Sequence, residues 1–271
     1  MGPLGVAAPT VQDAAQTSAA VKLSILLPVR YEGINIPLIL KILHAVVEVP
    51  HEVLVVYDEP DDDSVPAVQL LQPRFPHVRL IYNTLGAGVA QAIRAGVQAA
   101  RGDHVLLFAV DDLGPVMALD EMLRLMEQGY DLVSGTRYAG GGRRLGGSLT
   151  GRFLSRLANW SFQWLAGGTL TDATTGIKLV RRSVFEQIRL EAAPVGWAVA
   201  FELAIKAQLA GLRLGEVPII SIDRPFGGTS SFSIGPWVLQ YLRWFVWGTA
   251  RLRFRQAWQR PARTGGALRD P

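Results

Sequence analysis

The chain has 271 residues, of which 49% are hydrophobic, and its 27 basic and 23 acidic side chains give a formal net charge of +4. This apolar content excludes disorder of the whole chain, and the absence of cysteine excludes disulfides and thiolate metal sites. The charge is uneven: from Pro236 onward there are seven arginines and one acid, while the preceding 235 residues carry 20 bases and 22 acids. Nucleic-acid binding by the whole domain is therefore excluded, because it calls for an extended basic face.

The composition predicts a tail, one domain, a helix and a second tail, over residues 1–20, 21–233, 234–258 and 259–271. Residues 1–20 lack the basic start and the long apolar run of a signal peptide, so we expect a flexible segment there. No stretch reaches the roughly 18 uninterrupted apolar residues of a spanning helix. The nearest approach is 236–250, which Arg243 interrupts.

Four continuous apolar runs in the first half predict strands buried on both faces, at 22–28, 52–57, 78–82 and 104–110. Helical patterns lie between them, with apolar residues four positions apart at Ile34, Leu38, Ile42 and Val46, and again at Val89, Ile93 and Val97. This alternation of strands and helices predicts a doubly wound α/β sheet, in which ligands bind at the carboxyl ends of the strands.

The second half gives weaker signals, which predict strands at 131–135, 174–180 and 216–222 and helices at 148–166 and 199–210. The glycine-rich segment 139–147 is expected to be a mobile loop, and 223–233 a second loop. The last helix is expected to begin near Pro236, since proline is favoured in the first turn.

Two acidic clusters follow predicted strands. Five of the six residues in 58–63 are acidic, which indicates either a solvated turn or a nucleotide pocket where a carboxylate accepts hydrogen bonds from the ribose or the base. Asp111 and Asp112 follow the fourth run, where they either cap a helix or hold Mg²⁺ or Mn²⁺.

Arginines gather on the predicted loops of the second half. Arg137 lies just past the predicted strand 131–135, and Arg152 and Arg224 adjoin the two glycine-rich segments. Because the guanidinium group pairs with phosphate through two parallel donors, this arrangement favours an anionic substrate over an ordinary solvated surface.

Taken together, several segments resemble family 2 glycosyltransferases of the GT-A fold, and within them the dolichol-phosphate mannosyltransferase-like enzymes that load sugars onto polyprenyl phosphate. The segments on which this resemblance rests include ILLPVRYEG (25–33), VLVVYDEPDDDS (53–64), AVDDLGP (109–115), GTRYAGGG (135–142) and TDATTGIKLVRRSVF (171–185). Their order and spacing run from about Lys22 to Trp247. The resemblance implies a single Rossmann-like domain with a mixed, mainly parallel sheet flanked by helices.

The resemblance also implies an activity, namely inverting transfer of a hexose from a GDP- or UDP-linked sugar to polyprenyl phosphate, with Mg²⁺ or Mn²⁺, on the cytoplasmic face of the cell membrane. Pro28, Tyr31, Glu32 and Asp58 would contact the nucleotide, Asp111 with Asp112 would hold the metal, Arg137 and Arg152 would meet the phosphates, and Arg224 would help to close a loop over them.

Three departures from the family pattern keep other hypotheses open. The first Asp of the Asp-x-Asp metal motif is Ala109, the later Gln is Leu113, and a frequent loop lysine is Ser231. One alternative is a membrane-bound module that binds nucleotide sugars without turnover, and a weaker one is transfer to a non-lipid acceptor. A dehydrogenase is weaker still, because the first strand turns into Pro28-Val29-Arg30 and not into a glycine-rich dinucleotide loop.

The nature of the acceptor decides whether a general base is needed. A phosphate monoester is largely dianionic at neutral pH and needs none, because its second pKa is about 6. An alcohol acceptor would need a base, for which the second half offers Asp172, Glu202 and Asp223.

The C-terminal segment interleaves seven aromatic residues with four arginines between Trp237 and Trp258. These residue types suit the headgroup boundary of a bilayer, although an ordinary helix that packs its rings onto the domain has the same composition. We prefer the interfacial helix, because it would bring the domain to a lipid-linked acceptor.

Overall fold

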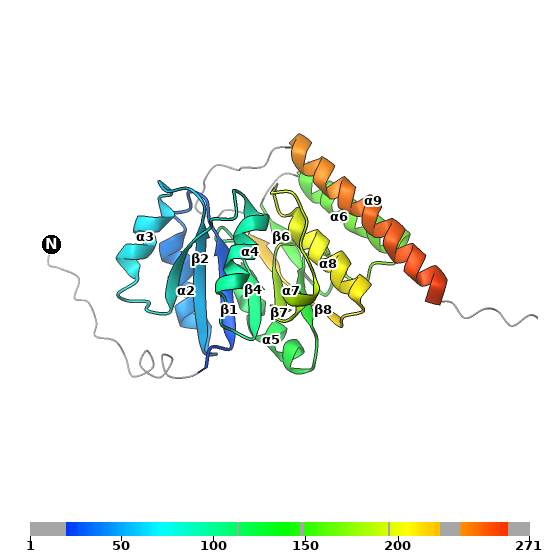
Figure 1. The fold of residues 1–271 in the computed structure, drawn as a ribbon. Coiled ribbons are helices and arrows are strands. Elements are labelled where there is room, and N and C mark those ends of the chain that lie inside the picture. Colours follow the sequence, from blue (N-terminus) through cyan, green and yellow to red (C-terminus); the bar gives the residue numbers. More distant parts are fainter. Residues whose placement is uncertain (1–19, 113, 147–148, 195, 223–233, 260–271) are drawn as a thin grey trace, which may run out of the picture.

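The computed structural model describes residues 20–112, 114–146, 149–194, 196–222 and 234–259 (Figure 1). It confirms the α/β architecture, with a seven-stranded sheet in the order β3-β2-β1-β4-β7-β5-β8. These strands are β1 (Leu23–Pro28), β2 (His51–Tyr57), β3 (Val78–Tyr82), β4 (His104–Leu107), β5 (Leu132–Thr136), β7 (Lys178–Arg181) and β8 (Leu214–Pro218). Only β7 runs against its neighbours, so the sheet is mixed but mainly parallel.

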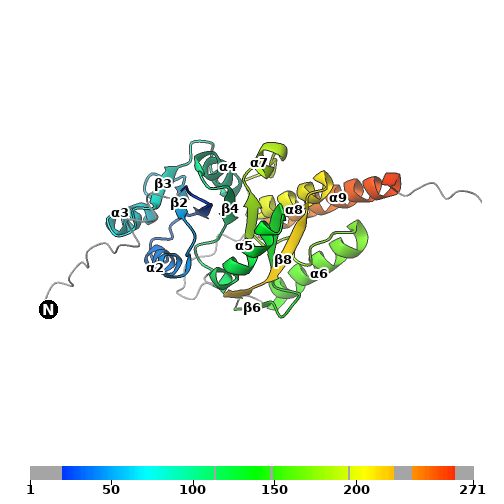
Figure 2. The same cartoon turned by 90° about the horizontal axis from the view of Figure 1, so that it is seen from below.

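The core is divided into two hydrophobic clusters, one on each face of the sheet, because successive residues of a strand point to opposite faces. One face is covered by α2 (Ile36–Val46), α3 (Ser64–Leu71), the short helix η1 (Gly114–Ala118) and α5 (Leu119–Glu127). The other is covered by α4 (Val89–Ala99), α7 (Val184–Gln187) and α8 (Ala198–Ala210). Figure 2 shows these two layers of helices on either side of the strands.

Two further helices lie beyond α8, and they are α6 (Leu149–Ala166) and α9 (Ile234–Gln259). Figure 1 shows them side by side at one end of the molecule. Phe162 of α6 meets Phe245 of α9 edge to face, with ring centroids 5.5 Å apart. Arg253 of α9 donates to the carbonyls of Trp164 and Leu165 at the end of α6, which satisfies groups that a helix terminus leaves without partners.

Several predicted boundaries were wrong. The fourth run stops being a strand at Leu107, and the strand expected from 174 begins only at Lys178. The strand expected over 216–222 is split into β8 and β9 (Ile220–Ile222), because the first part pairs with β5 and the second part pairs with β6.

The segment 139–147, expected to be a mobile loop, contains a strand. Arg143–Leu145 forms β6, which pairs in parallel with β9 in a separate two-stranded sheet. Glycine still matters in this turn, because a Cβ on Gly142 would lie 2.2 Å from the carbonyl oxygen of Thr136. The expected loop therefore contains a short strand that pairs with β9.

The apolar stripe chosen for the first helix was also wrong. Ile34 is 68% exposed and Val46 is 40% exposed, whereas the buried positions are Ile36, Ile39, Leu40 and Leu43. The helix is apolar on more than one stripe, so spacing alone did not reveal which stripe faces the sheet.

Candidate functional site

Most of the expected site residues lie at or just after the ends of β1, β2, β4 and β5, whose carboxyl ends meet at one edge of the sheet. Because β7 is antiparallel to both β4 and β5, these two strands point the same way as β1 and β2. The chain order reverses between β1 and β4, which are neighbours in the sheet. Such a reversal is where open α/β sheets form their ligand crevice.

The loop after β1 is tied to the acidic segment after β2 by hydrogen bonds from its backbone. The N–H groups of Tyr31 and Gly33 donate to Asp62 Oδ2 at 3.1 Å and to Asp63 Oδ1 at 2.9 Å. Asp62 is buried and also accepts from the N–H of Ser64 at 2.8 Å. Part of the acidic cluster is thus satisfied by donors within the chain, and it shapes the loop that carries the expected nucleotide contacts.

Pro28, Tyr31 and Glu32 sit at the start of this loop. Tyr31 has a left-handed backbone with φ of 55°, and its hydroxyl donates to Asp61 Oδ1 at 3.0 Å. This hydrogen bond, followed by burial and the neighbouring acids, raises the pKa of Tyr31. The Glu32 carboxylate accepts from Asn35 at 2.6 Å, beside the end of β1 at Pro28. The side chain of Tyr31 is exposed to solvent.

Asp58 links this region to the start of α4. Its Oδ2 accepts from the N–H of Gly88 at 2.7 Å, in the turn that leads into the helix. Gly88 has φ of 97°, and a Cβ there would lie 2.5 Å from the carbonyl oxygen of Pro194. Asp58 therefore holds the α4 N-terminus at the carboxyl edge of the sheet, where helix N–H groups favour anions.

Asp111 and Asp112 follow β4 as expected, and Asp112 is tied to a strand of the second sheet. Asp112 accepts from Ser221 Oγ at 2.6 Å and from the N–H of Ile222 at 2.9 Å, and so uses both carboxylate oxygens on β9. Gly114 approaches the same strand so closely that a Cβ would lie 1.5 Å from the carbonyl oxygen of Ile220. Within the described parts of the chain, no group of three or more His, Asp or Glu side chains is placed to hold a metal ion.

Arg137 lies one residue beyond β5 and forms a buried ion pair with Asp172, the closest contact being Nε to Oδ2 at 2.6 Å. Burial acts to lower the pKa of Arg137, but the charge and hydrogen bonds of Asp172 outweigh it and raise the pKa. Lys178 lies nearby and donates to Ser134 Oγ at 2.9 Å. Its burial lowers the pKa of Lys178 to about 8, although Asp172 and Glu216 act in the opposite direction.

The remaining expected residues are distributed as follows. Arg152 is half-buried in the first turn of α6, and its Nη1 lies 3.5 Å from the carbonyl oxygen of Arg144. Glu202 is buried in α8, where it pairs with Lys206 at 2.7 Å and accepts from the N–H groups of Glu191 and Ala192. Four other positions named above lie outside the described residues: Leu113, Asp223, Arg224 and Ser231.

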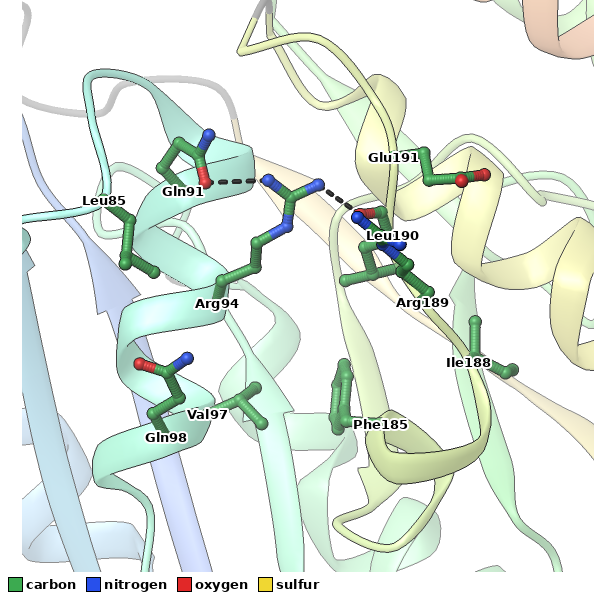
Figure 3. Close-up of a pocket in the computed structure, with 10 residues that line it drawn as sticks. All are labelled: Leu85, Gln91, Arg94, Val97, Gln98, Phe185, Ile188, Arg189, Leu190 and Glu191. Carbon is green, nitrogen blue, oxygen red and sulfur yellow. Dashed lines mark hydrogen bonds between the residues drawn. The ribbon is translucent and has the colours of Figure 1, made fainter.

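A groove of about 690 Å³ lies apart from these residues, between α4 and the segment 185–191. Figure 3 shows Arg94 spanning it, with hydrogen bonds to Gln91 and to the carbonyl of Leu190. None of the residues expected to carry chemistry is among those that line it.

The aromatic residues of α9 are divided between two environments. Trp244 is buried and Tyr241, Phe245 and Trp247 pack against the same core cluster, so much of the aromatic content serves the domain. Apolar side chains are nevertheless exposed on both outer helices. They are Phe153, Leu154, Leu157, Trp160, Trp164 and Leu165 on α6, and Val238, Leu239, Leu242, Val246 and Phe254 on α9. No described helix is long and apolar enough to cross a membrane.

Sequence reasoning missed the groups that hold Arg137. The sequence indicates a role for Asp172 only as a base, and it indicates none for its neighbours Asn159 and Glu216. The segment that contains Asp172, TDATTG, has neither periodicity nor a charge run, so its sequence offers no sign of the pair.

Comparison with known proteins gives a consistent result. Residues 24–189 match the family described as Glycosyl transferase family 2. Polyprenol monophosphomannose synthase of Mycolicibacterium smegmatis is 29% identical over 220 residues, which are 80% of this chain and 83% of that protein. Dolichol-phosphate mannosyltransferase of Pyrococcus furiosus is 25% identical over 82% of this chain, which spans only 62% of that longer protein.

Solved structures establish the likeness of fold. Glucosyl-3-phosphoglycerate synthase from Mycobacterium tuberculosis, in complex with Mn²⁺, UDP and glucosyl-3-phosphoglycerate, superposes with a TM-score of 0.65 at 18% identity. The match covers 88% of this chain and 83% of that one. The fold is the GT-A arrangement that the sequence led us to expect.

Proposed function

Because the chain belongs to glycosyl transferase family 2 and is a glycosyltransferase, we propose that it transfers a hexose from a nucleotide sugar to a polyprenyl phosphate, with inversion at the anomeric carbon. The observation that carries the proposal is the similarity to a polyprenol monophosphomannose synthase over most of both chains. The arrangement of acids and an arginine at one sheet edge supports it, since this chemistry must bind a diphosphate and a phosphate together.

The nucleotide would bind across the ends of β1 and β2. Tyr31 offers an exposed ring for the base, and Glu32 and Asp58 offer carboxylates close to the N-terminus of α4. Pro28 ends the strand and fixes the start of the loop. The hydrogen bonds from this loop to Asp62 and Asp63 hold it in place before the donor arrives, which reduces the entropic cost of binding.

A divalent cation fits the site through Asp111. Mg²⁺ is commonly bound by one or two carboxylates together with substrate phosphates, so Asp111 and the donor diphosphate are a sufficient ligand set. Asp112 is committed to β9, and Ala109 removes the ligand that the family pattern supplies. When bound, the cation would neutralise negative charge on the diphosphate leaving group.

The arginines would stabilise the phosphate groups. Arg137 would meet one of them at the end of β5, with Arg152 and Arg224 completing the site from α6 and from the segment after β9. A dianionic acceptor phosphate can attack the sugar carbon without a side-chain base. The deep burial of Asp172 and Glu202 agrees with this, because both carboxylates are already bound by donors within the chain.

The acceptor would be reached through the exposed apolar side chains of α6 and α9. We define the docking face as Leu154, Trp160 and Trp164 of α6 with Leu239 and Leu242 of α9. Exposed Arg156, Arg243 and Arg251 lie on the same two helices and would favour an anionic bilayer. The protein would act as a peripheral enzyme on the cytoplasmic face of the membrane.

The decisive assay measures release of UDP or GDP from UDP-glucose, GDP-mannose and related donors, with and without a polyprenyl phosphate and with Mg²⁺, Mn²⁺ or EDTA. We expect nucleotide release that depends on the lipid, with an equivalent amount of glycolipid product. Binding of a nucleotide sugar without any transfer would instead favour the binding module, and an Ala109→Asp variant that gains no activity would strengthen that outcome.

The docking face calls for a separate experiment. Deleting α9 would expose the core, since Trp244 and Leu252 are buried, so point substitutions are the better test. We expect Trp160→Glu with Trp164→Glu to reduce sedimentation with vesicles of phosphatidylglycerol and phosphatidylcholine. Leu70→Glu is the matched control, because Leu70 is 82% exposed on α3. Equal partitioning of all the variants would remove the docking face from the proposal.

A further inference from the structure

We propose that Asp172 is a positioning residue, which aims Arg137 at the strand-end site and is itself held in place by Asn159 of α6. The inference rests on the function proposed above, in which Arg137 binds a phosphate group. It assigns to Asp172 a role distinct from that of a general base.

The two side chains meet edge to edge. Arg137 donates from Nε to Asp172 Oδ2 at 2.6 Å and from Nη2 to Oδ1 at 2.9 Å, and its backbone N–H reaches Oδ2 at 3.2 Å. Three donors of one residue on one carboxylate fix both the backbone and the guanidinium plane. Nη1 is the nitrogen directed away from this edge, so it is the donor that Arg137 can present to an incoming anion.

Asp172 is held from two further sides. Glu216 of β8 accepts from the backbone N–H groups of Thr171 at 2.8 Å and Asp172 at 3.0 Å. Asn159 donates to Thr174 Oγ1 at 2.8 Å and approaches Asp172 Oδ1 at 3.4 Å, while the N–H of Thr174 returns to Asn159 at 3.3 Å. The carboxylate therefore has a fixed position relative to both β8 and α6.

These contacts leave Asp172 no capacity to act as a base. Besides the three donors of Arg137, its carboxylate accepts from Thr174 Oγ1 at 3.2 Å and from Asn159. A carboxylate has about four lone-pair sites, so these donors occupy it fully. The charges of Arg137 and Asp172 also act on the hydroxyl of Tyr241, whose pKa is raised by burial. A second helix, α9, thus reaches the same pair.

The test is whether Asp172 acts through Arg137. We expect Asp172→Asn to lower kcat by about 100-fold, as misplacement of a charge-stabilising group does, with a smaller change in KM for the donor. Arg137→Met should have a similar effect, and the double variant should be no worse than Arg137→Met alone. Effects that multiply in the double variant would overturn the proposal, as would loss of the acidic limb of the kcat–pH profile in Asp172→Asn, because a base would behave in that way.

A gentler variant covers the case in which Asp172→Asn does not fold. Asn159→Ala should lower kcat about five-fold, the factor that one ordinary hydrogen bond is worth, and should have no effect in the Arg137→Met background. Gln163→Ala, one turn further along α6, is the matched control and should leave kcat unchanged. A five-fold loss that persists without Arg137 would contradict the positioning role.

A measurement without turnover separates this inference from the proposed function. In ¹⁵N NMR the Nε–H signal of Arg137 should exchange slowly with solvent in the wild type and rapidly in Asp172→Asn, with GDP and UDP binding weakened in parallel. An Arg137 signal that exchanges as fast as those of exposed arginines would refute the pair. If these results hold but no polyprenyl phosphate accepts a sugar, the acceptor proposal fails and the positioning role stands.

Discussion

The hydrogen bonds between Asp112 and β9 allow a quantitative test of what this acid does. If Asp112 anchors β9, removing its carboxylate should lower the free energy of unfolding. The same substitution should cost less in a variant that already lacks the Ser221 hydroxyl, because one of the two hydrogen bonds is then absent. The relevant contacts are Asp112 to Ser221 Oγ at 2.6 Å and to the N–H of Ile222 at 2.9 Å. A metal ligand, by contrast, would affect chiefly the dependence of activity on the cation.

The expected magnitudes follow from the burial of the partners. Ser221 is only 5% exposed, while Asp112 is half-buried. A hydrogen bond to a charged group contributes about 1.5–3 kcal/mol, and partial solvation of Asp112 favours the lower end. We therefore expect Asp112→Ala to cost roughly 2–3 kcal/mol and Ser221→Ala about 1.5 kcal/mol. Their coupling energy should be about 1 kcal/mol.

Urea unfolding of the wild type, both single variants and the double variant supplies the four free energies of this cycle. Asp111→Ala is the adjacent control: it should change stability by less than about 1 kcal/mol but shift the Mn²⁺ or Mg²⁺ dependence of transfer. A coupling energy within about 0.3 kcal/mol of zero would refute the anchoring role, because the free-energy changes of two independent substitutions are additive to about that accuracy.

Three further comparisons test the structure elsewhere. Glu202→Gln should cost about 2–4 kcal/mol in urea unfolding, because it loses a buried charge paired with Lys206, yet leave kcat unchanged; unaltered stability with a fall in kcat would revive it as a base. Burial lowers the pKa of Lys178 from 10.5 to about 8, so between these pH values the unfolded chain binds a proton that the folded chain does not. The free energy of unfolding of the wild type should therefore rise with pH over this interval by roughly 3 kcal/mol relative to Lys178→Met. Parallel pH profiles of the two proteins would contradict this. Gly88→Ala should destabilise more than Gly86→Ala, since both have positive φ but only Gly88 adjoins Pro194; equal losses would deny the clash.

The strands and helices of the first half could be predicted because their signals are local. Runs such as 78–82 are continuous and bounded by turn residues, and the structure places β3 at Val78–Tyr82. Boundaries failed where a distant partner decides them. Residues 143–145 form a strand because β9 is available to pair with them, and that contact spans more than 70 positions in the chain.

The positions of the candidate site residues in the fold could be predicted only in part. The sheet edge was predictable, because carboxyl ends of parallel strands meet there whatever the side chains are. Which contact each residue of the acidic clusters makes was not predictable. Asp62 and Asp63 accept backbone hydrogen bonds from the loop after β1, Asp112 is bound to β9, and Asp58 accepts from the backbone of Gly88 before α4.

The sequence by itself determined the fold class, the family and the sheet edge at which most of the candidate site residues lie, since these depend on the order of strands and on short motifs. Only the tertiary structure decided which charged groups have partners. Arg137 and Asp172 are 35 positions apart and meet because β5 and the segment before β7 converge. Likewise, the rings of α9 are divided between core and surface by its packing against α6 and α8. The free energy of a charge or a ring depends on what surrounds it, and only the folded chain supplies those surroundings.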